Sequence, residues 1–135
     1  MQPNNHGLPD GYHTVTPYLA ATSTDSLIEF LEAAFEARMI ERNTREDGTV
    51  AHAEVEIGDS KLMMCDATEQ HPFAPATFYL YVQDVDETYR LAIDAGARSI
   101  AEPENMPYGD RHGGVVDPAG HRWWIATRLL DHAKE

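Results

Sequence analysis

The sequence predicts an α+β fold built from two βαβββ modules, and an internal repeat is the main reason. Residues 17–41, PYLAATSTDSLIEFLEAAFEARMIE, align without a gap with residues 78–102, FYLYVQDVDETYRLAIDAGARSIAE. Both stretches read as strand, polar turn, helix and strand. Alternating apolar residues after each copy predict further strands. The chain has 135 residues, enough for one domain with one core.

Each copy contains a helix with a recognisable start. Ser26 precedes Glu29 by three residues, and Asp84 stands in the same relation to Glu87, which predicts a capping box in both copies. Gly96 predicts the end of the second helix. Apolar residues recur at helical spacing in both copies: Leu27, Ile28, Leu31, Ala34 and Phe35, then Val85, Tyr89, Ala92 and Ile93.

The rest of each module is predicted to be a β-meander. In the first module the strands are VAHAEVEI and SKLMMC, joined at Gly58-Asp59. The second has a loop from Glu102 to Gly109, a strand near 111–116 and the strand HRWWIATR. A module with one helix covers only one face of its sheet, so the two modules are expected to pack or pair. The expected division is a flexible segment 1–10, a module 11–67, a linker 68–75, a module 76–128 and a tail 129–135.

The turn DPAG at 117–120 is predicted to have a structural role. Pro118 suits a turn position with φ near −65°, and Gly120 suits one with positive φ. Asp117 can accept hydrogen bonds from the amides of the turn. His121 has the strand parity of Trp123, so it is expected to point away from a pocket and to fix the hairpin.

The element order resembles the vicinal-oxygen-chelate superfamily, which contains glyoxalase I, bleomycin-resistance proteins and extradiol dioxygenases. GYHTVTPYL, HAEVEIGDSKLMM and YGDR…DPAGHRW are similar to its PhnB-like branch, over roughly residues 11–128. The resemblance implies a curved mixed sheet around a pocket, helices on the outer face, and commonly a dimer in which modules of two chains pair. Relatives usually have glycine where Glu36 follows the first helix, which predicts a strained or reshaped cap.

Metal-dependent members of that superfamily hold one divalent ion with four side chains from the first and last strands of each module. By position these fall on Thr16, Thr77, Trp124 and one of Leu62, Met63 or Met64. None is a good ligand for a divalent ion, which prefers imidazole or carboxylate. The usual four-ligand metal site is therefore expected to be missing, and no cofactor is predicted.

A divalent metal elsewhere stays open, because His52 and Glu54 stand at i and i+2 on one strand face. They could act as acid and base, or as metal ligands together with Glu56 or a residue of another strand. The alternative is that both are hydrogen-bonded residues of a half-exposed sheet.

Aromatic and hydroxyl side chains are predicted to line the pocket. Such a surface suits a small planar or amphipathic molecule, and the net charge of −13 favours a neutral or cationic one. The alternative is that the rings fill the core or a dimer interface. The candidate ligand-binding residues are Tyr18, Thr77, Tyr79, Tyr81 and Trp124 on the inner face, and Tyr108 and Arg111 at the rim.

Charge and composition limit the partners. The acidic balance argues against nucleic acid and anionic membranes, and no apolar run approaches the roughly 20 residues that span a bilayer. Cys65 is the only cysteine, which excludes an intrachain disulfide. We expect a cytoplasmic homodimer, since unpaired sheet edges favour association. Two functions remain open: a binding protein for a small molecule, or a lyase or isomerase that uses His52 and Glu54.

Overall fold

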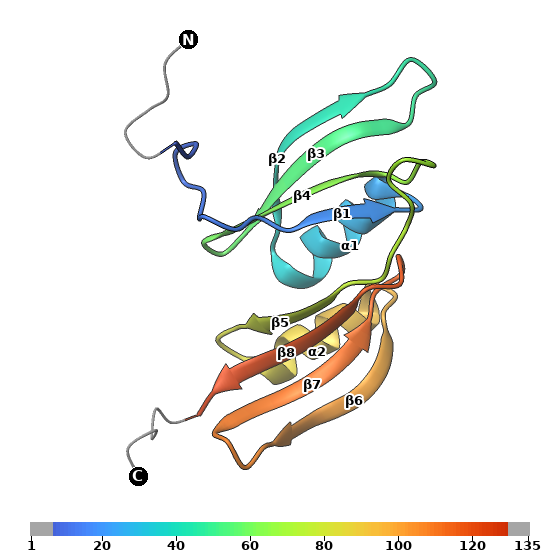
Figure 1. Cartoon of the computed structure of the whole chain (residues 1–135). Coiled ribbons are helices and arrows are strands. Elements are labelled where there is room, and N and C mark those ends of the chain that lie inside the picture. Colours follow the sequence, from blue (N-terminus) through green and yellow to red (C-terminus); the bar gives the residue numbers. More distant parts are fainter. Residues whose placement is uncertain (1–6, 130–135) are drawn as a thin grey trace.

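The computed structural model describes residues 7–129, and within them each module has the predicted βαβββ order (Figure 1). The first module contains β1 (Tyr18–Ala21), α1 (Thr24–Phe35), β2 (Arg38–Thr44), β3 (Val50–Ile57) and β4 (Ser60–Asp66). The second contains β5 (Thr77–Tyr81), α2 (Val85–Asp94), β6 (Arg98–Asn105), β7 (Asp110–Val116) and β8 (Arg122–Arg128). Most of the segment 1–10 and of the tail 129–135 lies outside the described residues.

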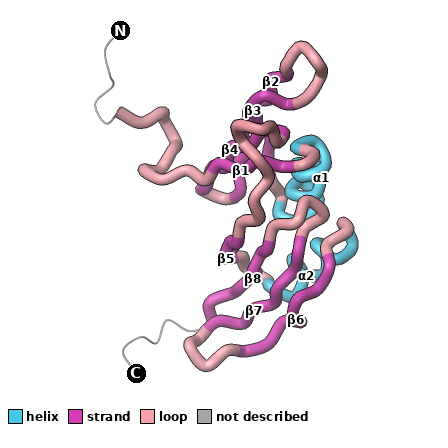
Figure 2. Tube along the Cα trace, turned by 45° about the vertical axis from the view of Figure 1, so that its right-hand side comes forward, coloured by secondary structure: helices cyan, strands magenta, loops and turns pink. Residues whose placement is uncertain are grey.

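Each module forms a four-stranded mixed sheet, in the orders β1-β4-β3-β2 and β5-β8-β7-β6. The first strand of each module pairs in parallel with the last, and the other pairs are antiparallel. Figure 2 shows both helices on the same side of the sheets, where α1 contacts α2. We call the helix-free side of each sheet its open face. The predicted α+β class is confirmed.

The strand register shows which residues of the two modules correspond. Tyr18 pairs with Met63 in the first sheet as Tyr79 pairs with Trp124 in the second. Met63, not Leu62 or Met64, is therefore the counterpart of Trp124. On the other side of β4, Met63 pairs with Glu54 of β3, whereas on the other side of β8, Trp124 pairs with Gly114 of β7.

Local irregularities of strand pairing occur in both sheets. The predicted loop from Glu102 is wrong in its first part, because β6 continues to Asn105 and pairs with β7 across a register shift. In β3 the register slips between Val50 and His52, so Val50 rather than Ala51 is the buried residue at that end. One-residue irregularities of this kind, as in a β-bulge, shift the alternation of side chains along a strand.

One hydrophobic core joins the modules. Trp123 of β8 stacks on Phe78 of β5, with ring centroids 4.3 Å apart. Its indole also lies 4.9 Å from the ring of Phe35, at the end of α1. The core therefore spans the gap between two sheets that share no ladder of hydrogen bonds. No helix among the described residues is long and apolar enough to cross a membrane.

The helix caps agree with the sequence only in part. Asp84 caps α2 as predicted, accepting a hydrogen bond from the Glu87 amide. The cap of α1 is Ser23, which accepts from the Ser26 amide, so the assignment of Ser26 as the cap is wrong. Glu36 ends α1 at φ 58° and ψ 34°, the left-handed region in which a Cβ is unfavourable.

The DPAG turn has the predicted structural role. Asp117 accepts hydrogen bonds from the amides of Ala119 and His121 and from the Trp123 indole. His121 is fully buried, and its Nδ1 accepts a hydrogen bond from the Ala76 amide at 2.9 Å. Burial lowers the pKa of His121, although the Asp117 carboxylate acts in the opposite direction. The ring is therefore held neutral, at the point where the linker meets the hairpin.

The left-handed Glu36 predicts a stabilising substitution. Glu36→Gly should raise the free energy of unfolding by about 1 kcal/mol, because glycine adopts this conformation without the Cβ clash. Urea denaturation measures the change. Glu36→Ala makes the same change in charge but keeps the Cβ, so it should give no comparable gain. Equal stabilisation by both variants would show that charge, not backbone strain, is responsible.

The buried neutral His121 predicts a loss of stability in mild acid. The unfolded chain takes up a proton below pH about 6.5, whereas the folded chain resists protonation because its pKa is lowered. This contribution is complete above about pH 6.5 and is lost as the pH falls toward the folded pKa. In His121→Asn, whose amide oxygen can still accept from Ala76, the urea midpoint should fall less between about pH 7.5 and about pH 5.5. An unchanged pH dependence in His121→Asn would contradict the assignment.

Candidate functional site

A buried carboxylate organises the open face of the second module. Alternation along β5 turns Tyr79 and Tyr81 to this face, while Phe78 and Leu80 pack into the core. Asp110, the first residue of β7, is 1 % exposed. Its Oδ2 accepts hydrogen bonds from the hydroxyls of Tyr79 at 2.7 Å and Tyr81 at 2.9 Å. Its Oδ1 accepts from Arg128 Nη1 at 3.0 Å.

These contacts fix the protonation states. Burial by itself would raise the pKa of Asp110, but hydrogen bonds from Tyr79, Arg128 and Tyr81 outweigh it and lower that pKa. Partial burial and hydrogen bonds with Tyr108 and Asp110 raise the pKa of Tyr79. The pKa of Tyr81 is raised mainly by its hydrogen bond to Asp110. At neutral pH the site is an ionised carboxylate covered by protonated phenols.

Aromatic rings surround this carboxylate. His112 of β7 stacks on Trp124 of β8, with centroids 5.0 Å apart and planes inclined by 23°. The Tyr108 hydroxyl lies 3.2 Å from His112 Nδ1 and 3.4 Å from the Tyr79 hydroxyl. Gly114 makes room for the stack, since a Cβ there would lie 2.5 Å from the Trp124 ring. We call Asp110, Tyr79, Tyr81, Tyr108, His112 and Trp124 the Asp110 cluster.

In the Asp110 cluster, a rigidly held carboxylate lies beneath tyrosine rings that are accessible to solvent. Tyr79, Tyr81 and Tyr108 are 42 %, 59 % and 50 % exposed, although their hydroxyls are tied into one network. Exposed aromatic surface of this kind is unusual on a small soluble domain and is typical of binding surfaces. Tyr79 and Tyr81 also border a cleft of about 560 Å³ between the modules, next to the end of α1 and the β3–β4 turn.

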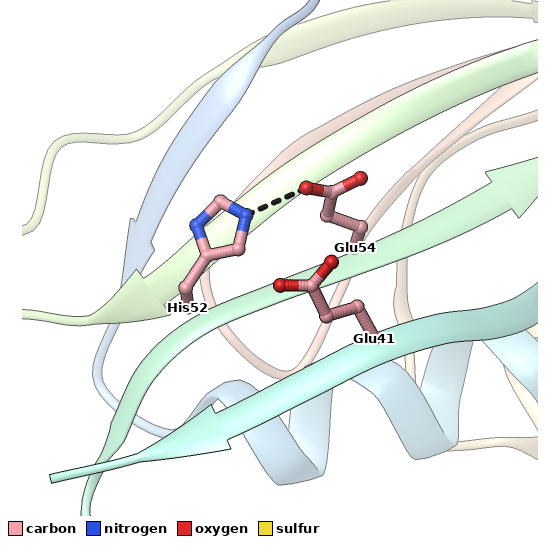
Figure 3. A group of neighbouring side chains, drawn as sticks. All are labelled: Glu41, His52 and Glu54. Atoms are coloured by element: carbon pink, nitrogen blue, oxygen red, sulfur yellow. Dashed lines mark hydrogen bonds and ion pairs between the residues drawn. The ribbon is translucent and has the colours of Figure 1, made fainter. Parts of the chain in front are cut away.

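The open face of the first module carries different chemistry (Figure 3). His52 Nε2 lies 2.7 Å from Glu54 Oε2, and the Tyr18 hydroxyl lies 3.1 Å from His52 Nδ1. Glu41 of β2 is the cross-strand neighbour of Glu54 and contributes a second carboxylate. We call Glu41, His52 and Glu54, together with Tyr18, the His52 cluster. Burial raises the pKa of Tyr18, so its hydroxyl stays protonated.

The two clusters are related by the internal repeat. Tyr18 and His52 have ring centroids 5.6 Å apart, and Tyr79 and His112 have centroids 5.9 Å apart. In both pairs the tyrosine hydroxyl is at hydrogen-bond distance from histidine Nδ1. The clusters differ because Gly114 replaces Glu54 and Trp124 replaces Met63. The first module therefore presents carboxylates where the second presents an aromatic stack.

The structure groups some of the sequence-predicted residues and separates others. Tyr79, Tyr81, Tyr108 and Trp124 meet in one cluster, and Tyr18 lies with His52 and Glu54. Thr77 lies exposed at the start of β5. Glu56 is taken up by ion pairs with Lys61 and Arg38, whose hydrogen bonds lower its pKa.

Arg111 does not join the Asp110 cluster. It pairs with Asp86 of α2, and its Nη2 lies 2.9 Å from Asp86 Oδ1 on the helix side of the sheet. Arg111 is therefore not grouped with the residues of the candidate site. The sequence reasoning missed Asp110 and His112 as site residues. Alternation along β7, which puts Asp110, His112 and Gly114 on one face, was the signal that could have found them.

Comparison with known proteins places this architecture. Residues 12–125 match the model of the Glyoxalase/Bleomycin resistance protein/Dioxygenase superfamily. An uncharacterized protein of Mycobacterium bovis is 33 % identical over 128 residues, covering 87 % of this chain and 84 % of the relative. A Mycobacterium tuberculosis relative is also 33 % identical, covering 87 % of this chain and 75 % of its own length.

Solved structures agree with the family match. TioX from Micromonospora sp. ML1 has a TM-score of 0.74 and 26 % identity, covering 87 % of this chain and 99 % of that one. TnmS3, an antibiotic binding protein from Streptomyces sp. CB03234, has a TM-score of 0.69 at 17 % identity, with 86 % and 95 % covered. The latter likeness is one of fold. With two repeated βαβββ modules and a family match along nearly its whole length, the chain belongs to the glyoxalase/bleomycin resistance protein/dioxygenase superfamily.

Proposed function

We propose that the protein binds a small, planar, cationic organic molecule at the Asp110 cluster. The observation that carries this proposal is an ionised carboxylate buried beneath three half-exposed tyrosine rings. Rings of this kind hold planar groups by stacking and attract cations through their faces. The net charge of −13 adds a long-range attraction for a cation. TnmS3 shows that this fold can carry an antibiotic-binding site.

The arrangement favours binding over reaction in the second module. The Tyr79 and Tyr81 protons are engaged by Asp110, and Arg128 occupies the other carboxylate oxygen. These groups therefore form a fixed, hydrogen-bonded surface for a ligand, and none of them is a free acid or nucleophile. A preorganised site of this kind gains affinity because little side-chain freedom is lost when the ligand binds.

We further propose that the protein forms a homodimer, and that residues 11–67 and 76–128 are the units that pair in it. Each open face is a surface with exposed tyrosines rather than an enclosed cavity, and β1 and β5 each lie at the edge of a sheet. A second copy would cover both features. Membership of the PhnB-like branch is also a proposal, supported by the HAE stretch at 52–54 and by the shared fold of a Bacillus cereus PhnB protein at 16 % identity.

A lyase or isomerase reaction at His52 and Glu54 is the second candidate function. Its support is the chain of contacts from Tyr18 through His52 to Glu54, which has the geometry for moving a proton. Loss of turnover in His52→Ala with retained fold would be its signature, whereas the binding function depends on the other module.

Ligand binding predicts a selective effect of Asp110. Ethidium, a planar cation, should bind the wild type and quench its tryptophan fluorescence. Asp110→Asn should weaken this binding about tenfold, or about 1.4 kcal/mol, because a charge in a partly desolvated site is lost. Trp124→Leu should weaken it through loss of stacking. Tyr89→Leu on α2, outside the cluster, is the matched control, and urea denaturation checks that each variant is folded.

The planar anion 8-anilinonaphthalene-1-sulfonate distinguishes recognition of the ligand's charge from nonspecific binding of aromatic molecules. It should bind more weakly than ethidium and should not lose affinity in Asp110→Asn. Equal affinity of wild type and Asp110→Asn for ethidium would refute the proposed role of the carboxylate.

Native mass spectrometry of the untagged chain tests the dimer. We expect a mass of about twice the 15.1 kDa chain. Tyr81→Glu, which puts a charge on the open face, should shift the protein toward the monomer. Glu87→Lys, on the exposed surface of α2, is the control. A monomer at all concentrations would contradict the pairing of modules across two chains.

A further inference from the structure

We propose that Glu41, His52 and Glu54 form a binding site for a divalent transition-metal ion. Each side chain offers one ligand atom, and these atoms lie within 4.8 Å of one another. Figure 3 shows the two carboxylates and the imidazole converging from β2 and β3. One imidazole and two carboxylates are a ligand set for ions such as Zn²⁺ or Mn²⁺.

The charges of the His52 cluster favour the binding of a cation. Glu41 and Glu54 are direct cross-strand neighbours, and like charges in that relation are destabilising. Glu54 is only 8 % exposed, so solvent screens its charge poorly. The nearby arginines are engaged elsewhere, Arg38 with Glu56 and Arg42 with Asp25. A bound divalent ion would offset both carboxylates at once.

Tyr18 prepares His52 to be a ligand. A hydroxyl can donate or accept a hydrogen bond, so Tyr18 can satisfy Nδ1 in either tautomer of the imidazole. In the tautomer with its proton on Nε2, His52 donates to Glu54 and its Nδ1 accepts from Tyr18. With metal on Nε2, the proton moves to Nδ1 and Tyr18 accepts. A metal-bound histidine usually makes a hydrogen bond of this kind through the ring nitrogen that does not bind the metal.

Small side-chain movements suffice to close the site around an ion. Ligand atoms about 2.0–2.1 Å from a tetrahedral ion lie about 3.3 Å from one another. His52 and Glu54, now at 2.7 Å, must therefore separate slightly, and Glu41 must approach. Glu41 is exposed, and turning it inward would exchange its hydrogen bond, accepted from the Asn43 side-chain amide, for the ion.

This site differs from the metal site that the family resemblance implies. The inherited positions fall on Thr16, Met63, Thr77 and Trp124, none of which is a ligand for such an ion. The proposed site lies one strand away, on β3 and β2. It is also independent of the Asp110 cluster, because no residue is shared between them.

Isothermal titration of the apo, untagged protein with Zn²⁺ tests the proposal. We expect one Zn²⁺ per chain with micromolar affinity or better. Glu41→Gln and His52→Gln should each weaken binding more than about tenfold. Glu54→Gln should do the same while leaving the apo protein at least as stable, since it removes the repulsion with Glu41.

The internal repeat supplies the matched control. His112→Gln removes the counterpart of His52, a histidine with the same tyrosine contact but with Gly114 in place of Glu54, and should leave Zn²⁺ affinity unchanged. Co²⁺ gives a second readout through its visible absorption, which should appear in the wild type and in His112→Gln but not in Glu54→Gln. Sub-stoichiometric Zn²⁺, or equal affinity in Glu41→Gln and the wild type, would overturn the proposal. Neither result would affect ethidium binding at the other module.

Discussion

The packing of Trp123 is the contact on which the rest of the molecule depends. Its ring lies against Phe78 of its own module and Phe35 of the other, and its indole nitrogen donates to Asp117. Within residues 7–129 the two sheets share no ladder of hydrogen bonds, so side-chain burial of this kind holds the modules together. The DPAG turn, often read as a mere connection, therefore helps to set the position of the central core residue.

Once the helices and the shared core occupy one side of both sheets, strand alternation decides what the other side can do. The same Tyr–His pair occurs on both open faces, but two positions differ: the residue two places after the histidine on its own strand, and the cross-strand neighbour of that residue. Gly114 lets Trp124 stack on His112, whereas Glu54 puts a carboxylate beside His52. A few differing positions on the open faces thus give the two repeated modules one group of aromatic rings and one group of metal-ligand atoms.

The two buried carboxylates illustrate opposite solutions to one physical problem. Asp110 is buried, and three hydrogen-bond donors keep it ionised. Glu54 is almost as buried, yet it faces Glu41 across the strand and relies on His52. Asp110 therefore has its own set of donors, whereas Glu54 and Glu41 lie opposite each other with one imidazole beside them.

The sequence by itself determined the features that depend on neighbours along the chain. The repeat, the helices, the structural role of Asp117 and the orientation of His121 away from the open face follow from periodicities and turn chemistry within a few residues. The same alternation correctly separated Tyr79 and Tyr81 from Phe78 and Leu80. Tertiary structure decided what depends on register between strands, because bulges near Ile40, Ala51 and Ile100 shift the pairing in ways that no local pattern reports. For that reason only the fold could bring Glu41 to His52, place Asp110 under two tyrosines, and turn Arg111 toward Asp86.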